Sequence, residues 1–205
     1  MKPKDGTASA SYNPANALVI SCSESPLLSA FMHLVEPRCI LQTLGGTLPG
    51  KPPRIGAATS GGDSAWGTVA YAVDRLALRH IVICGHSRCC VPPMWLRGEW
   101  DTRNQGDSTV ESALKPQLID THLASQSWLT EQTTRLEGFL AQSRHRANTT
   151  THTLWFDEDR GDILMLSGAS RRFVSVDDAD IQLLLRLLDL TQERAQAVLT
   201  QIRQI

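Results

Sequence analysis

Short apolar runs alternate with amphipathic stretches through the first half of the chain. Residues 17–21 (ALVIS), 39–44 (CILQTL) and 80–85 (HIVICG) are apolar runs rich in β-branched residues. Because they are mostly continuous rather than alternating, they predict strands buried on both faces of a parallel sheet. Residues 27–35 and about 63–78 carry apolar side chains at helical spacing. The order strand–helix–strand–helix–strand predicts parallel pairing through right-handed crossovers.

Turn and capping signals separate these runs. Ser25 is the expected N-cap of the first helix, with Pro26 at its first helical position. The helix is expected to stop before Pro37. The Gly45–Gly46 pair ends the second strand, and residues 50–62, rich in Pro and Gly, predict a loop.

The second half is less regular. Residues 109–143 have helical character, with Pro116 marking a start or a kink. Residues 151–167 predict a hairpin whose acidic turn contains Gly161. Residues 177–205 are strongly helical and predict two further helices.

Length and composition fit a single domain. The 205 residues are 41% hydrophobic and 20% charged, which is enough to bury a sizeable core. We expect a flexible polar leader over residues 1–16 and one α/β domain over 17–205, with a mostly parallel central sheet flanked by helices and a C-terminal hairpin. The net charge of −1 gives no indication of a nucleic acid or an anionic membrane as partner. Charged residues interrupt the longest apolar runs, so no membrane span is predicted.

The cysteine count bears on the cellular compartment. The polar N-terminal stretch has no apolar core typical of a secretory signal. The chain has an odd number of cysteines, Cys22, Cys39, Cys84, Cys89 and Cys90. This favours reduced thiols in the cytoplasm over a disulfide framework. Cys39 and Cys84 are expected in the core.

Three of the potential metal ligands fall at predicted strand ends. Cys22 closes the first strand, and His86 and Cys89 follow the third with the spacing His-x-x-Cys. Ligands of open α/β sheets sit at the carboxyl ends of the strands, so these side chains are expected to converge. Two thiolates and an imidazole suit Zn²⁺ and leave a fourth position open, as in catalytic zinc sites. Each residue alone also fits an ordinary buried role, and Cys90 is an alternative to Cys89.

A family resemblance rests on the stretches CSES (22–25) and AYAVDRLALRHIVICGHSRC (70–89). Together with LQTLGGTLP (41–49), they resemble the β-class carbonic anhydrases from about Ala17 to Cys89, with a weaker similarity over residues 151–176. The resemblance implies Zn²⁺ held by Cys22, His86 and Cys89, an α/β fold with a parallel core, CO₂ and bicarbonate as substrates, and a homodimer as the basic unit.

The chain departs from the family pattern beside the expected metal. The family motif Cys-x-Asp-x-Arg has Glu24 in place of the aspartate and Pro26 in place of the arginine. In the family this pair orients the zinc-bound water, or the aspartate itself takes the fourth zinc position. Glu24 is therefore the candidate catalytic residue, as a general base or as a group that blocks the site. Arg38, Arg54 and Arg88 are near enough in the sequence to be candidates for the replacement of this arginine, although a solvated surface position is the more common role for each. A cysteine, Cys90, stands where the family has glycine.

Three functions follow. The first is reversible CO₂ hydration, favoured because the expected ligand set is complete and because the loss of a residue that orients a ligand weakens a metal site by only about 10–100-fold. The second is hydrolysis of a CO₂-like molecule, carbonyl sulfide or carbon disulfide. The third is a zinc-binding protein without activity, its fourth position filled by Glu24. His122, His145 and His152 have no recognisable ligand spacing.

Overall fold

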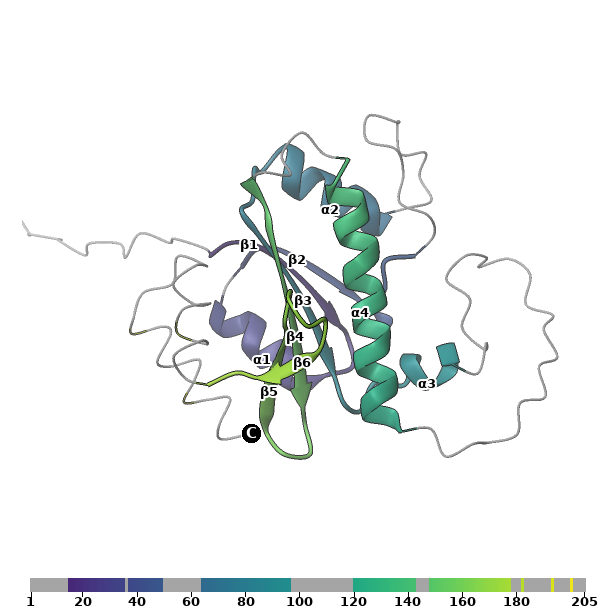
Figure 1. Ribbon diagram of the computed structural model, residues 1–205. Helices are drawn as coiled ribbons and strands as arrows, with labels where there is room; N and C mark the ends of the chain where they lie inside the picture. The colour runs from purple at the N-terminus through teal and green to yellow at the C-terminus, as the bar shows by residue number, and fades with distance from the viewer. Residues whose placement is uncertain are drawn as a thin grey trace, which may run out of the picture.

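The computed structural model describes residues 15–35, 37–49, 64–96, 120–142 and 148–177, with isolated positions beyond them. These residues form one six-stranded sheet with the order β2-β1-β3-β4-β5-β6 (Figure 1). The strands are β1 Ala15–Cys22, β2 Pro37–Thr43, β3 His80–His86, β4 Thr150–Asp157, β5 Asp162–Leu166 and β6 Phe173–Ser175. The helices are α1 Pro26–Val35, the 3₁₀ turn η1 Leu44–Gly46, α2 Ser64–Asp74, α3 Val91–Leu96 and α4 Thr121–Leu140.

The sheet confirms the predicted fold class. Strands β2, β1, β3 and β4 are mutually parallel, and β5 and β6 continue the sheet in antiparallel fashion. The predicted hairpin is present as β4 and β5, with Gly161 in its turn at φ 71°. Its first strand is also the fourth parallel strand, paired with β3 from His80–Thr150 to His86–Phe156.

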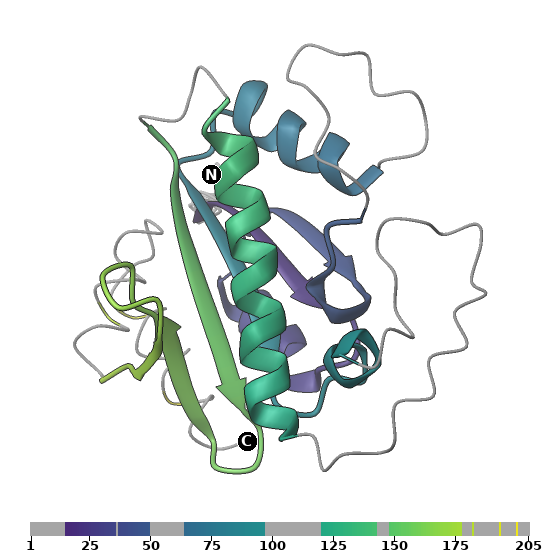
Figure 2. The ribbon, with the colours of Figure 1, turned by 45° about the vertical axis from the view of Figure 1, so that its right-hand side comes forward.

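Both faces of the central strands are covered, which explains their continuous apolar runs. On one face, α1 places Leu28 and Phe31 against Val19 and Val82 of the sheet. On the other, α2 and α4 pack a second core of buried residues, among them Trp66, Leu129 and Phe139, against Leu18, Ile20, Ile81 and Ile83. Figure 2 shows α4 running along this second face of the sheet. The strands are therefore buried from both sides, as parallel strands usually are.

Several element boundaries differ from those expected. The strand β1 begins two residues before residue 17, and α2 ends at Asp74 because the chain turns at Ala77, which has φ 51°. The helix α4 begins after Asp120, whose carboxylate accepts hydrogen bonds from the backbone N–H groups of His122 and Leu123. The short strand β6 was not expected. Residues 1–14, the 50–62 loop, Pro116 and the predicted helices after residue 177 lie outside the described residues, apart from isolated positions in those helices.

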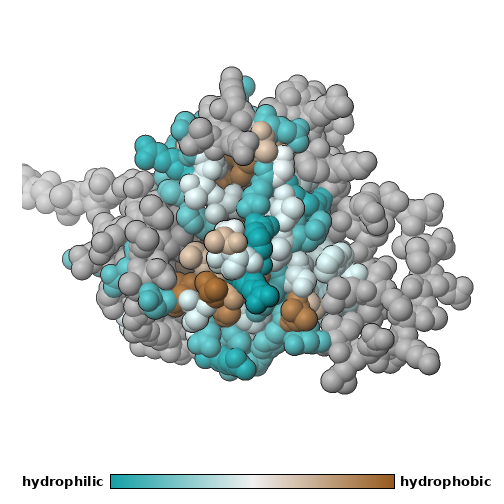
Figure 3. All heavy atoms as spheres, in the orientation of Figure 1, coloured by the Kyte–Doolittle hydropathy of each residue, from teal (hydrophilic) through white to brown (hydrophobic). Residues whose placement is uncertain are grey.

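The surface over α4 is mainly hydrophilic. Figure 3 shows the face that carries this helix, where hydrophilic and neutral residues dominate and hydrophobic residues lie in small separate groups. Among the described residues, Leu123 on α4 and Val174 on β6 are two of the large apolar side chains that are exposed. Among the described helices, none is long and apolar enough to cross a bilayer.

Candidate metal centre

The carboxyl ends of β1 and β3 lie side by side and bring the expected ligands together. Because Ser21 pairs with Cys84, Cys22 lies beside the end of β3, and His86 and Cys89 follow directly. All three side chains are buried. The Sγ atoms of Cys22 and Cys89 are 3.8 Å apart. Two thiolates bound to one tetrahedral zinc at about 2.3 Å would lie about 3.8 Å apart, so this pair fits the metal.

His86 is oriented as a metal-binding histidine usually is. Its Nδ1 lies 3.1 Å from Oε2 of Glu158, while its Nε2 is buried and has no hydrogen-bond partner among the described residues. A buried polar atom without a partner is costly and calls for an explanation. Metal-bound histidines commonly donate their second ring N–H to a carboxylate, which leaves the other nitrogen free to coordinate. The unpartnered Nε2 therefore fits a metal ligand.

Hydrogen-bond donors around the Cys22 sulfur favour its thiolate form. The backbone N–H groups of Gly45 and Glu24 donate to it at 3.2 and 3.4 Å. A hydrogen bond from Cys89, together with these backbone donors and the nearby imidazole of His86, lowers the pKa of Cys22 to about 5 against the cost of burial. The same bond raises the pKa of Cys89. Burial alone would lower the pKa of His86, but the Cys22 sulfur and Glu158 raise it above its usual value. Cys22 thus ionises easily and Cys89 keeps its proton. A divalent cation bound between the two sulfurs would displace that proton.

Gly45 lies next to Cys22 in a backbone conformation that favours glycine. It has φ 66°, and a Cβ built on it would lie 2.8 Å from Cβ of Val91. Its carbonyl accepts a hydrogen bond from Nε1 of Trp128 at 2.8 Å. The tight turn after β2 therefore requires a residue without a side chain, and this turn brings an N–H donor to the Cys22 sulfur.

Glu24 lies beside the two sulfurs at an exposed position. Its Oε2 is 3.9 Å from the Sγ atoms of both Cys22 and Cys89. The ligand atoms of Cys22, Glu24, His86 and Cys89 all lie within 4.8 Å of one another. An oxygen and a sulfur bound to the same tetrahedral zinc would be about 3.5 Å apart, so the carboxylate lies close to the fourth position.

Cys89, rather than Cys90, joins this group. Cys90 is exposed, and partial desolvation of its thiol, together with Glu24, raises its pKa to about 11. Cys84 is fully buried, as expected, while Cys39 on β2 is only partly buried. The five cysteines are all free thiols.

The candidate replacement arginine nearest to the site in the sequence, Arg88, is engaged elsewhere. Arg88 donates from Nε to Asp159 at 2.9 Å and pairs with the same carboxylate through a second nitrogen. Arg38 is exposed on β2, and Arg54 lies outside the described residues. Arg88 is therefore engaged by the β4–β5 turn rather than by Glu24.

Two residues of the site had no role beside the metal ligands assigned from the sequence. Glu158, expected only as part of an acidic turn, binds His86 and accepts a hydrogen bond from Oγ of Ser25 at 2.5 Å. Ser25 caps α1 as predicted, accepting from the N–H of Leu28 at 3.3 Å, and thus has two partners. Glu158 lies 72 residues after His86, and only the pairing of β3 with β4 brings them together. The acidic turn was the only signal in the sequence.

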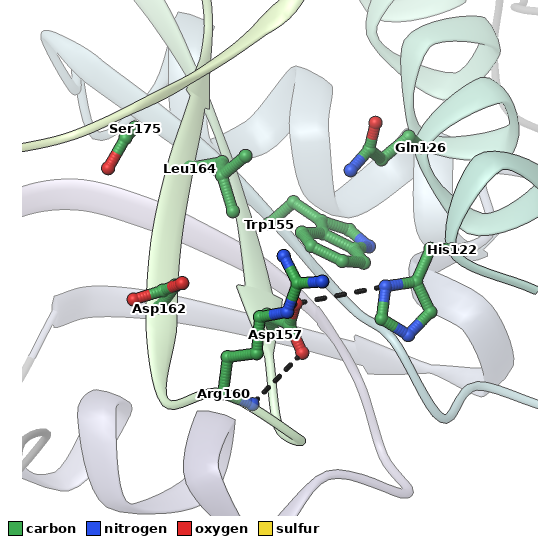
Figure 4. Close-up of a pocket in the computed structure, with 8 residues that line it drawn as sticks. All are labelled: His122, Gln126, Trp155, Asp157, Arg160, Asp162, Leu164 and Ser175. Carbon is green, nitrogen blue, oxygen red and sulfur yellow. Dashed lines mark hydrogen bonds and ion pairs between the residues drawn. The ribbon is translucent and has the colours of Figure 1, made fainter.

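A second group of titratable side chains lies at the β4–β5 turn. Figure 4 shows His122 and Arg160 near Asp157 at a cavity of about 270 Å³. Nδ1 of His122 and Nε of Arg160 are 3.7 and 3.8 Å from Oδ2 of Asp157. His122 also lies near Asp159, which Arg88 binds. Two arginines already balance these carboxylates, so the group is best explained as a network that stabilises the turn. None of the residues lining the cavity belongs to the candidate metal centre.

The order of the strands and the likeness to solved structures define the fold: the chain has the β-carbonic anhydrase fold. It matches the β-carbonic anhydrase CcaA with a TM-score of 0.53 and 22% identity, over 78% of this chain and 84% of that one. It also matches a tetrameric β-carbonic anhydrase of Sordaria macrospora with a TM-score of 0.52 and 16% identity, over 81% and 84% of the two chains.

The sequence is similar to a carbonic anhydrase of Pseudomonas aeruginosa PAO1. The two are 27% identical over 176 residues, which cover 78% of this chain and 77% of the relative. No protein-family model matches the chain. The resemblance to β-class carbonic anhydrases is thus confirmed in sequence and in fold, and the chain is carbonic anhydrase-like.

Proposed function

We propose that this chain is a zinc-dependent enzyme that interconverts CO₂ and bicarbonate. The observation that carries the proposal is the buried, unpartnered Nε2 of His86 beside two thiols at the spacing of tetrahedral zinc ligands. Cys22, Cys89 and His86 would hold the metal, and Glu24 would act beside it. The likeness to carbonic anhydrases in sequence and fold supports the choice of substrate.

The chemistry is divided between the metal and the chain. Zn²⁺ bound by these three residues would lower the pKa of a water molecule at the remaining position to about 7. Glu24 would receive the proton that this water releases when it ionises, before it attacks CO₂. Because Glu24 is exposed, the proton can pass from its carboxylate to solvent. Glu158 and Ser25 would hold the ring of His86 so that Nε2 faces the metal.

Stopped-flow CO₂ hydration at about pH 8 tests the proposal, since a water of pKa about 7 is mostly ionised there. Zinc-loaded protein should accelerate hydration above the buffer rate, and Cys22→Ser should abolish this acceleration. Cys39→Ser, which changes a thiol outside the site, is the matched control and should keep the activity. A zinc-loaded wild type that is no faster than buffer would contradict the proposal.

A second function is favoured by the 3.9 Å distances from Glu24 to both sulfurs. If this carboxylate is itself the fourth ligand, the chain is a zinc-binding protein without activity. Glu24→Ala separates the two functions. It should lower a measurable hydration rate if Glu24 moves the proton, and it should create activity in an inactive protein if Glu24 blocks the metal.

We propose further that the protein is a homodimer of the cytoplasm. The dimer is the unit that the family resemblance implies, and the five free thiols suit a reducing compartment. Light scattering coupled to gel filtration should give twice the mass of the chain. A monomer would contradict the dimer.

A further inference from the structure

The Glu24 carboxylate lies 3.9 Å from both sulfurs, close enough to bind a metal held by them. To stay beside such a metal without binding it, the carboxylate needs a partner. The family pattern supplies an arginine for this task, and here that position is Pro26. We propose that Cys90 is the positioning residue that holds the Glu24 carboxylate beside the fourth metal position. This inference rests on the zinc-dependent function proposed above.

Cys90 offers one donor to each oxygen of the carboxylate. Its backbone N–H lies 3.3 Å from Oε2 of Glu24, and its Sγ lies 3.2 Å from Oε1. A carboxylate held at both oxygens by one residue has a defined orientation, which is what a bidentate arginine provides elsewhere. The thiol is a weaker donor than a guanidinium, so the restraint is weaker.

The backbone of Cys90 is fixed by its neighbours. Cys89 is buried in the metal group, and Val91 is fully buried at the start of α3. Val91 also lies against the turn at Gly45, where an added Cβ would meet it at 2.8 Å. The N–H of Cys90 is therefore held between two anchored residues, and its thiol extends from a fixed backbone.

Of the two contacts with Glu24, only the one from the thiol depends on residue 90 being a cysteine. Glycine, which the family has at this position, would keep the N–H donor and lose the thiol. Cys90 is not itself a member of the ligand group, whose sulfurs come from Cys22 and Cys89. Its thiol therefore acts on the metal only through Glu24.

Visible absorption of the Co²⁺-substituted protein, recorded against pH, tests the proposal. In the wild type, solvent at the fourth position should make the spectrum change with pH. In Cys90→Ala the released carboxylate should bind the metal, so the change with pH should be lost. Cys90→Ser keeps a side-chain donor and should retain the change of the spectrum with pH. Cys39→Ala is the control for the removal of a thiol elsewhere. The double variant Cys90→Ala/Glu24→Ala should regain the pH dependence, because no carboxylate remains to bind.

The outcomes separate this role from the proposed function. If Cys90→Ala keeps the wild-type pH dependence, the role of Cys90 is overturned while the metal chemistry stands. A pH-independent wild-type spectrum would also overturn it, since the carboxylate would already be bound. If the spectra behave as expected but no CO₂ hydration is seen, the role of Cys90 stands and the proposed activity fails. Failure to bind Co²⁺ or Zn²⁺ would overturn both.

Discussion

At the scale of single residues, His86 depends on side chains from two distant segments. Glu158 in the β4–β5 turn binds its Nδ1, and Ser25 at the start of α1 binds the other oxygen of Glu158. The backbone N–H of Glu158 donates in turn to Oγ of Ser87 at 3.1 Å. The ring orientation that leaves Nε2 free is thus set by residues that do not contact the metal position.

Replacing Glu158 tests this dependence. Glu158→Ala should weaken zinc binding by about 10–100-fold, because the imidazole loses the carboxylate that orients it. Competition with a chromophoric chelator measures the affinity. Asp162→Ala removes an exposed carboxylate from the same hairpin and should leave the affinity unchanged. Equal affinities for Glu158→Ala and the wild type would refute this role for Glu158.

Gly45 provides a second test at this scale. Gly45→Ala should lower the free energy of unfolding by about 2–4 kcal/mol, because alanine at φ 66° is strained and its Cβ meets Val91. Gly67 in α2 has open space around its position, so Gly67→Ala should instead stabilise the protein by about 0.5–1 kcal/mol. Urea unfolding of both variants gives the comparison. Similar effects from the two substitutions would contradict the close approach at Gly45.

At the scale of elements, the pairing of β3 with β4 places two histidines next to each other, one on each strand. Nδ1 of His80 and Nε2 of His152 are 3.2 Å apart. Burial and the neighbouring His80 lower the pKa of His152 to about 4. The folded protein therefore keeps His152 neutral at a pH at which an unfolded chain, with a histidine pKa of about 6.5, already binds a proton.

This histidine should make stability depend on pH. Because its pKa is lower in the folded state, its contribution is complete above about pH 6.5 and is lost as the pH falls towards 4. Since the side chain is partly exposed, we expect this loss to be about 2 kcal/mol. Unfolding of metal-free protein should show a smaller loss on acidification for His152→Gln than for the wild type, whereas His33→Gln, on the surface of α1, should follow the wild type. Parallel pH profiles for all three proteins would rule out a contribution of His152 to the pH dependence of stability.

The sequence predicted the elements that carry strong local signals. The apolar runs gave β1, β2 and β3, and the capping role of Ser25 followed from its place before Pro26. The convergence of Cys22 with His86 could be predicted because parallel strands end at the same edge of a sheet. The contact of Glu158 with His86 could not be predicted, because it depends on the register between β3 and β4. Arginines were the only candidate partners for Glu24 in the sequence, and the thiol of Cys90, a weak donor, gave no signal there.

At the scale of the whole molecule, the proposed metal would connect segments that are distant in the chain. The Cys22 turn, the end of β3 and, through Glu158, the β4–β5 hairpin meet at one point. A ligand that binds only the folded state stabilises it by mass action, by about 4 kcal/mol at 1,000 times its dissociation constant.

Removal of the metal should therefore lower the melting temperature. For a chain of this length, about 4 kcal/mol corresponds to a decrease of about 10 °C. Calorimetry with and without a chelator should show this decrease in the wild type and in Cys39→Ser. Cys22→Ser, which lacks one ligand, should melt at the same temperature in both conditions. A wild type that does not respond to the chelator would argue against a bound metal.

X-ray absorption at the zinc edge of the purified protein is the most direct measurement of the central proposal. It should find zinc with two sulfur neighbours at about 2.3 Å and an imidazole nitrogen at about 2.0 Å. Cys90→Ser should leave both sulfurs in place, and Cys89→Ser should remove one. Protein that retains no zinc after purification and reloading, or zinc bound without these two sulfurs, would contradict the site described for Cys22, His86 and Cys89.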